Sequence, residues 1–79
     1  MAKNRKKIPV FYGDMITVFN QKRVVLEGVE RIVFCDSEKM IFRKNRLITV
    51  EGKKLVLEEL GNDNIAVKGS ISALRFEEV

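Results

Sequence analysis

Apolar residues recur every eight residues along much of this chain. Alternation of apolar and polar positions is typical of strands with one buried face, and many of the residues are β-branched or aromatic, which favours strands. We expect both apolar series to point into a core: Ile16, Val24, Ile32, Met40, Ile48 and Val56, and, two residues later in each unit, Val18, Leu26, Phe34, Phe42 and Val50. The pattern predicts strands near residues 15–19, 23–27, 31–35, 39–43, 47–51, 55–59, 64–68 and 71–76.

The segments between these strands contain residues that favour turns. Glycine and asparagine tolerate the positive φ angles that tight hairpins require. Asn20 stands in the first segment where glycines stand in later ones, which indicates that a backbone conformation is the shared requirement. A bulge is expected after Gly69. The predicted structural turn residues are Asn20, Gly28, Asn45, Gly52, Gly61 and Gly69.

The repeated glycines also raise the alternative of a phosphate-binding loop. Such a loop needs several closely spaced glycines followed by the N-terminus of a helix. The phrase "VEGKK" has one glycine and leads into the strand-like "LVLEEL". The glycines are therefore interpreted as corners of a β framework.

These patterns predict one small all-β domain. The 79 residues allow a single domain, with about seven or eight short antiparallel strands in a meander that forms a roll, a sandwich or a small barrel. A β-solenoid-like stack is the alternative, because a fixed period also fits stacked coils. We expect residues 1–13 to form a basic, flexible segment and residues 14–79 to form the domain. Exposed edge strands would favour a homo-oligomer.

The composition argues against catalysis. The chain has no histidine, so a serine or cysteine nucleophile lacks its commonest base. Glu58 and Glu59 are adjacent on a predicted strand and should point to opposite faces. Cys35 is the only cysteine, which excludes an internal disulfide and leaves too few ligands for zinc; we expect it to be a buried or half-buried apolar side chain. The sequence predicts no enzyme, no cofactor, no metal and no small-molecule substrate.

Positive charge gathers in two places. The net charge of +4 equals the contribution of the basic N-terminus, and the remaining eleven basic residues balance the eleven acidic ones. Candidates for electrostatic contact are Lys3, Arg5, Lys6, Lys7, Arg43, Lys44, Arg46, Lys53 and Lys54. They make a small β-barrel that binds nucleic acid the alternative function, and peripheral contact with an acidic membrane a further possibility. Phe34 and Phe42 belong to the apolar series, which favours a core over a base-stacking platform.

Three phrases in the chain resemble those of the YabP/YqfC family of sporulation proteins. The first, L-x-G-V-x-x-I, is found at Leu26, Gly28, Val29 and Ile32. The second, L-x-I-x-G-x-x-L, is read from Leu47, Thr49 (in place of Ile), Gly52 and Leu55, with one additional residue before the glycine. The third, I-x-I-x-G-x-I-x-x-L-x-aromatic, is read from Ile65, Val67, Gly69, Ile71, Leu74 and Phe76. The resemblance covers roughly residues 15–77 and does not choose between the two branches of the family.

The resemblance implies a role in endospore development. It implies a non-enzymatic protein that acts in assembly or morphogenesis of the spore coat or cortex through protein–protein association. The expected partners are further copies of the chain or other sporulation proteins. The expected location is the cytoplasm of the mother cell, at the forespore surface or in the spore coat.

Overall fold

A computed structural model describes residues 10–12 and 15–78 of the chain, and in these residues the regular structure consists of antiparallel strands. This confirms the predicted all-β domain and its antiparallel strands. Seven strands are present, within the predicted number. They are β1 (Val10–Tyr12), β2 (Ile16–Phe19), β3 (Arg23–Leu26), β4 (Arg31–Cys35), β5 (Lys39–Arg43), β6 (Leu47–Gly61) and β7 (Asn64–Glu77).

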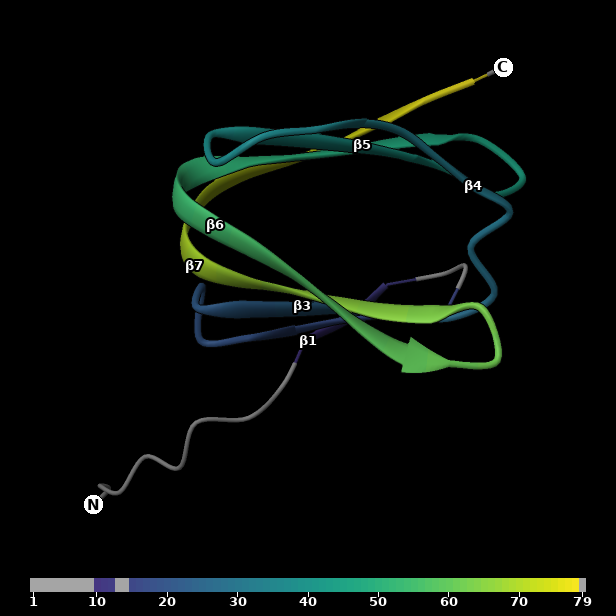
Figure 1. Cartoon of the computed structure of the whole chain (residues 1–79), viewed down its shortest axis with the longest axis horizontal. Coiled ribbons are helices and arrows are strands. Elements are labelled where there is room, and N and C mark those ends of the chain that lie inside the picture. The colour runs from purple at the N-terminus through teal and green to yellow at the C-terminus, as the bar shows by residue number, and fades with distance from the viewer. Residues whose placement is uncertain (1–9, 13–14, 79) are drawn as a thin grey trace.

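The strands form one sheet that folds over on itself. Their order is β1-β2-β3-β7-β6-β5-β4, with every neighbouring pair antiparallel. The order departs from a simple meander at one place, because β3 pairs with β7 and β4 lies at the far end of the sheet. Figure 1 shows the two layers that result, one containing β1 and β3 and the other containing β4 and β5. The long strands β6 and β7 bend at one end of the molecule and run through both layers.

Strands β6 and β7 are each one long strand where the sequence pattern predicts two short ones. Residues 47–51 and 55–59 belong to β6, and residues 64–68 and 71–76 belong to β7. The predicted turn at Gly52 is instead a bend within β6, where the pairing register with β7 shifts between Glu51 and Gly52 and again between Lys53 and Val56. Bulges of this kind allow a strand to bend without losing its partner.

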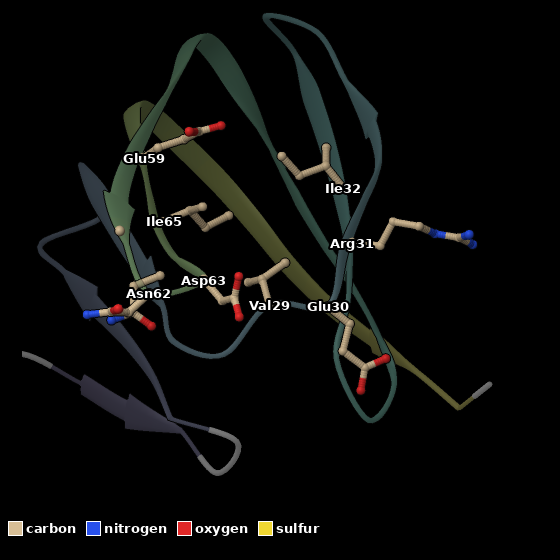
Figure 2. Close-up of a pocket in the computed structure, with 10 residues that line it drawn as sticks. Val29, Glu30, Arg31, Ile32, Glu59, Asn62, Asp63 and Ile65 are labelled. Carbon is tan, nitrogen blue, oxygen red and sulfur yellow. The ribbon is translucent and has the colours of Figure 1, made fainter.

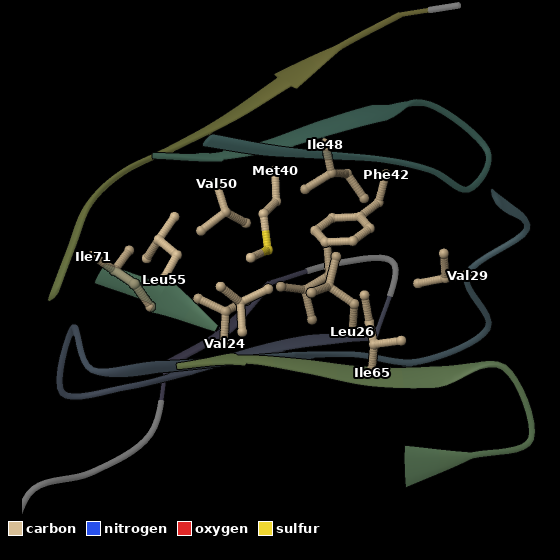
Figure 3. Packing of buried hydrophobic residues seen from close by; sticks show 12 residues of the cluster. Val24, Leu26, Val29, Met40, Phe42, Ile48, Val50, Leu55, Ile65 and Ile71 are labelled. Atoms are coloured by element: carbon tan, nitrogen blue, oxygen red, sulfur yellow. The ribbon is translucent and has the colours of Figure 1, made fainter. Parts of the chain in front are cut away.

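The core lies between the two layers. Met40, Phe42, Ile48 and Val50 project from one layer, and Val24, Leu26 and Ile65 project from the other (Figure 3). Leu55 and Ile71 lie at the bend (Figure 3). The fully buried side chains include Phe42, Ile16, Leu26, Met40, Ile48, Val24, Val50 and Val67. The eight-residue pattern therefore identified most of the core.

Three members of the apolar series are exposed, which corrects the prediction. Val56 is 59% exposed because the register shift between Lys53 and Val56 turns Leu55 inward in its place. In β4, Ile32 and Phe34 are 38% and 45% exposed. This strand is at the end of the sheet, and a bulge shifts its register between Ile32 and Phe34. Cys35 is exposed for the same reason, whereas we expected it to be buried or half-buried.

Two connections are tight hairpins with positive φ at both central residues. Asn20 and Gln21 have φ of 52° and 56°, and Lys22 N donates to Phe19 O over 2.9 Å. Asn62 and Asp63 have φ of 54° and 62° between β6 and β7. Both φ signatures fit the type I′ turn, which matches the twist of antiparallel strands. The N-terminal segment differs from expectation at 10–12, because β1 pairs there with β2.

Candidate functional site

A cavity lies where the two layers are open at one end. Its volume is 410 Å³, and Figure 2 shows it between the start of β4 and the β6–β7 hairpin. Carboxylates of Glu30, Glu59 and Asp63 line it together with apolar Val29 and Ile65. Its remaining lining residues are Arg31, Ile32, Gly61, Asn62 and Asn64. The cavity thus combines an acidic rim with an apolar floor.

Hydrogen bonds between the β3–β4 connection and the β6–β7 hairpin hold the cavity in shape. Gly28 N donates to Asn64 Oδ1 over 3.0 Å, and Val29 N donates to Asp63 O over 2.8 Å. Asn64 therefore has a structural role, and Gly28, at φ 69°, turns the chain toward β4. The lining offers carboxylates but no thiol, hydroxyl or imidazole. The cavity is an opening of the core with acidic groups around it.

The adjacent glutamates of β6 lie on opposite faces, as alternation predicts. Glu58 pairs with Arg23 and Lys68, each over 3.8 Å, whereas Glu59 lines the cavity. The two carboxylates therefore do not face a common substrate position. No group of three or more cysteine or acidic side chains in the described part of the chain is arranged to hold a metal ion.

The basic residues of the middle of the chain serve different local contacts. Lys44 donates through Nζ to the backbone oxygen of Glu27, and that of Gly28 lies 3.4 Å from the same nitrogen. The guanidinium of Arg46 lies 4.7 Å from the ring centre of Phe76, and Lys53 pairs with Glu38 over 3.9 Å. Lys54 has φ of 54° at the bend of β6. The predicted contact residues Lys3, Arg5, Lys6 and Lys7 lie outside the described residues.

The predicted turn glycines have two kinds of surroundings. A Cβ on Gly52 would lie 2.0 Å from Ser70 O, and one on Gly69, at φ 142°, would lie 2.6 Å from Lys54 O. These two glycines let the backbones of β6 and β7 approach closely at the bend. Gly61 has φ of 93° at the end of β6, and a Cβ there would meet nothing within 4 Å. Asn45 lies in the β5–β6 connection, where Lys44 N donates to Arg46 O over 2.9 Å.

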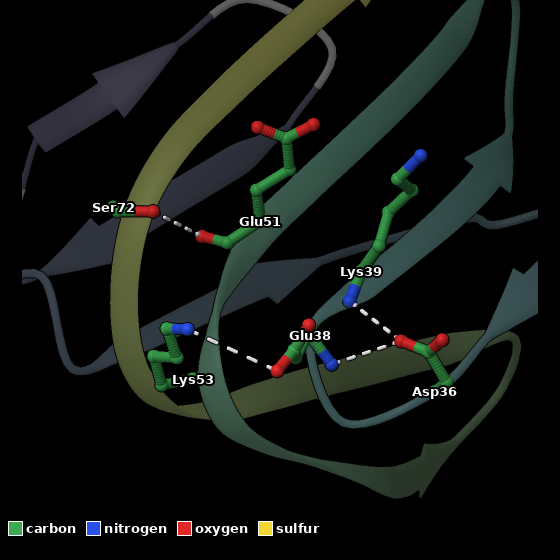
Figure 4. Close-up of polar contacts among 6 residues, drawn as sticks. All are labelled: Asp36, Glu38, Lys39, Glu51, Lys53 and Ser72. Atoms are coloured by element: carbon green, nitrogen blue, oxygen red, sulfur yellow. Dashed lines mark hydrogen bonds and ion pairs between the residues drawn. The ribbon is translucent and has the colours of Figure 1, made fainter.

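Polar contacts join the β4–β5 turn to the bend of β6 around Gly52 (Figure 4). Asp36 Oδ1 accepts hydrogen bonds from the backbone nitrogens of Glu38 and Lys39, both at 2.8 Å. Gly52 N donates to Glu38 O over 3.0 Å, and Leu55 N donates to Ser37 O over 2.8 Å. The glycine bend therefore positions one end of β4, and the bonded β3–β4 connection positions the other.

The strand held in this way is an exposed apolar edge. All five residues of β4 are exposed, and Ile32, Val33 and Phe34 expose 38%, 46% and 45% of their surface. Sequence reasoning placed Ile32 and Phe34 in the core and so missed this surface. Its one signal is the apolar run "IVFC", which is one residue longer than "VVL" in β3 and "MIF" in β5. Edge strands with open backbone groups and exposed apolar side chains are the kind of surface to which other chains can add a strand.

Comparison with known proteins identifies one family. The model of the YabP family matches residues 13–79 of the chain, which includes the cavity, the glycine bend and β4. No curated protein and no solved structure matches. Among the residues that the structure describes, there is no helix with the length and hydrophobicity to cross a membrane.

Proposed function

Because the chain belongs to the YabP family, we propose that it is a non-catalytic assembly protein of endospore development. Family membership indicates a sporulation-related protein. The finer role that we propose is assembly or morphogenesis of the spore coat or cortex in the mother cell, through protein–protein association.

The exposed strand β4 is the observation that supports association. Three consecutive apolar side chains stand in solvent at the edge of the sheet, although the chain buries a well-formed core elsewhere. Exposed apolar groups on an edge strand are a liability for a protein that works alone. They are useful to a protein whose task is to bind another chain.

The test of this role is deletion of the gene in a spore-forming host. We expect the deletion to lower the yield of heat-resistant spores by at least about tenfold, because an assembly step that depends on the protein fails. Complementation with the wild-type gene should restore the yield. A Phe42→Ala variant, which loses about 3–5 kcal/mol of stability through a cavity in the core, should restore it poorly. A normal yield in a strain without other members of the family would contradict the proposal.

A further inference from the structure

The edge strand β4 has an arrangement of side chains that allows it to recognise itself. Residues opposite each other on antiparallel strands share a face of the sheet. Arg31 is opposite Arg43 and Phe34 is opposite Ile41, whereas Ile32 is opposite the fully buried Phe42. Figure 2 shows Arg31 and Ile32 projecting to opposite sides of β4. Arg31 and Phe34 thus lie on the outer face, and Ile32 lies on the inner face.

The bulge in β4 determines which residues share the outer face. In a regular strand, residues separated by three or five positions lie on opposite faces. The register shift between Ile32 and Phe34 inserts Val33 and reverses the alternation. Cys35, opposite the buried Met40, is on the inner face. Asp36 follows β4 and its backbone nitrogen donates to Lys39 O, so continued alternation places it on the outer face. Arg31, Phe34 and Asp36 are therefore on one side of the strand.

We propose that β4 pairs antiparallel with β4 of a second copy, about a two-fold axis at Phe34. Phe34 then lies against Phe34 of the second copy, and Cys35 lies against the Ile32–Val33 bulge. Each Arg31 lies against Asp36 of the other copy. Every pair in this register shares a face, as an antiparallel sheet requires. The proposal deepens the proposed function, on which it rests, by naming the first partner in assembly as a second copy of this chain.

Charge complementarity selects this partner and this register. Arg31 lies beside Arg43 across the β4–β5 pair, and like charges in that position repel each other. Asp36 of a second copy brings an anion to this position, twice per dimer. A shift that centred the pair on Arg31 would bring the two arginines of the dimer together.

The other open edge of the sheet fits β4 less well. Among the described residues that edge is β1, which has three residues, whereas the self-pairing uses the five residues of β4 and Asp36 after them. Pairing β4 with β1 of another copy would also leave an edge open at each end and generate a filament. Pairing β4 with itself closes the assembly as a dimer.

The first test is the mass of the particle in solution. We expect sedimentation equilibrium to show a dimer of the full chain at about 100 µM and dissociation on dilution, as is usual for a small interface. Phe34→Lys should give a monomer at the same concentration, because it places two ammonium groups at the two-fold axis. Val56→Lys is the matched control, since Val56 is 59% exposed on β6, and it should remain a dimer. A monomeric wild-type chain, or masses above the dimer, would overturn the proposal.

The second test addresses the charge pair. Arg31→Glu should raise the dimer dissociation constant about tenfold, because glutamate would face Asp36 of the other copy. In an Asp36→Asn background, the same change should raise it by only about threefold. Asparagine keeps a side-chain oxygen for the two hydrogen bonds that Asp36 accepts in the β4–β5 turn. Equal effects in both backgrounds would show that Arg31 does not face Asp36 and would overturn the register.

The third test uses disulfide cross-linking to determine the register in which the two copies of β4 pair. In a Cys35→Ser background, Phe34→Cys should form a disulfide-linked dimer under mild oxidation, because residue 34 faces its own copy. The wild-type chain, with its thiol at Cys35 facing the bulge, should cross-link more slowly. Val56→Cys in the Cys35→Ser background should behave like an unpaired surface thiol. Faster cross-linking of the wild-type chain than of the residue 34 thiol would contradict a two-fold axis at Phe34.

The outcomes separate this inference from the function on which it rests. A monomeric protein whose deletion still abolishes heat-resistant spores would overturn self-pairing and leave the assembly role in place. A dimer whose deletion leaves spore yield normal would overturn the assembly role and leave the dimer in place. Phe34→Lys should fail to restore sporulation in the deletion strain, whereas Val56→Lys should restore it.

Discussion

At the scale of single residues, Gly52 and Gly61 illustrate two different reasons for glycine. Gly52 lies at the bend of β6, where the backbone of β7 approaches closely, and an added Cβ would stand 2.0 Å from Ser70 O. The obstacle is backbone, which cannot move aside as a flexible side chain can. Gly61 has open space around it and is required only for its φ of 93°. One position is therefore constrained by packing and the other by conformation.

The two glycines should respond differently to the same substitution. Gly52→Ala should lower the free energy of unfolding by about 3 kcal/mol or more, because the layers must separate at the bend. Gly61→Ala should lower it by about 1–2 kcal/mol through backbone strain alone. Urea denaturation followed by circular dichroism measures both. If the Gly52→Ala variant were as stable as the wild type but unable to bind a partner, Gly52 would instead belong to a binding loop.

At the scale of elements, turn residues determine the local hairpins, whereas bulges change the structure that the local pattern predicts. The β2–β3 hairpin has Gln21 at φ 56°, a conformation in which a residue with a side chain is strained. Gln21→Gly creates the Asn-Gly pair preferred in type I′ turns and should raise the free energy of unfolding by about 0.5 kcal/mol. Gln21→Val should lower it by about 1 kcal/mol or more, since β-branched residues tolerate positive φ poorly. Thermal melts of both variants beside the wild type show whether each substitution raises or lowers the stability. A Gln21→Gly variant less stable than the wild type would contradict the assignment of a type I′ turn.

The same contrast explains which elements the sequence could predict. Strands β2 to β5 follow from the eight-residue period, and Asn20 in the β2–β3 turn follows from its tolerance of positive φ. The fusion of two predicted strands into β6 does not follow, because Gly52 gives the same signal in a turn as in a bend. The exposure of Phe34 does not follow either, since it depends on a one-residue bulge and on the position of β4 at the end of the sheet. Both features are decided by pairing between distant strands.

At the scale of the whole molecule, the positive charge resides in the N-terminal segment. Lys3, Arg5, Lys6 and Lys7 account for the net charge of +4, so residues 8–79 have a net charge of zero. In that neutral body, Lys44 bonds to backbone oxygens and Lys53 pairs with Glu38. Attraction to polyanions should therefore come from the segment rather than from the folded domain.

Heparin chromatography tests this division of charge. Removing residues 1–7 should lower the salt concentration at which the protein elutes substantially, because four positive charges are lost. The double variant Lys53→Ala and Lys54→Ala, which removes two charges from the domain, should lower it by less than half as much. Thermal melts serve as the control for folding. A larger effect of the double variant would favour a basic binding surface on the domain and revive the nucleic-acid alternative.

The position of β7 between β3 and β6 has a consequence for the order of events during synthesis. Arg23 pairs with Lys68, so the hairpin of β2 and β3 gains its other neighbour only when a segment more than forty residues later has emerged. Until then β3 lacks its second hydrogen-bonded neighbour, and the sheet does not yet connect that hairpin to the layer of β4 and β5. Closing so long a loop is slow compared with forming a local hairpin. We therefore expect the domain to fold late and as one unit, with the sheet completed only when β7 pairs with β3.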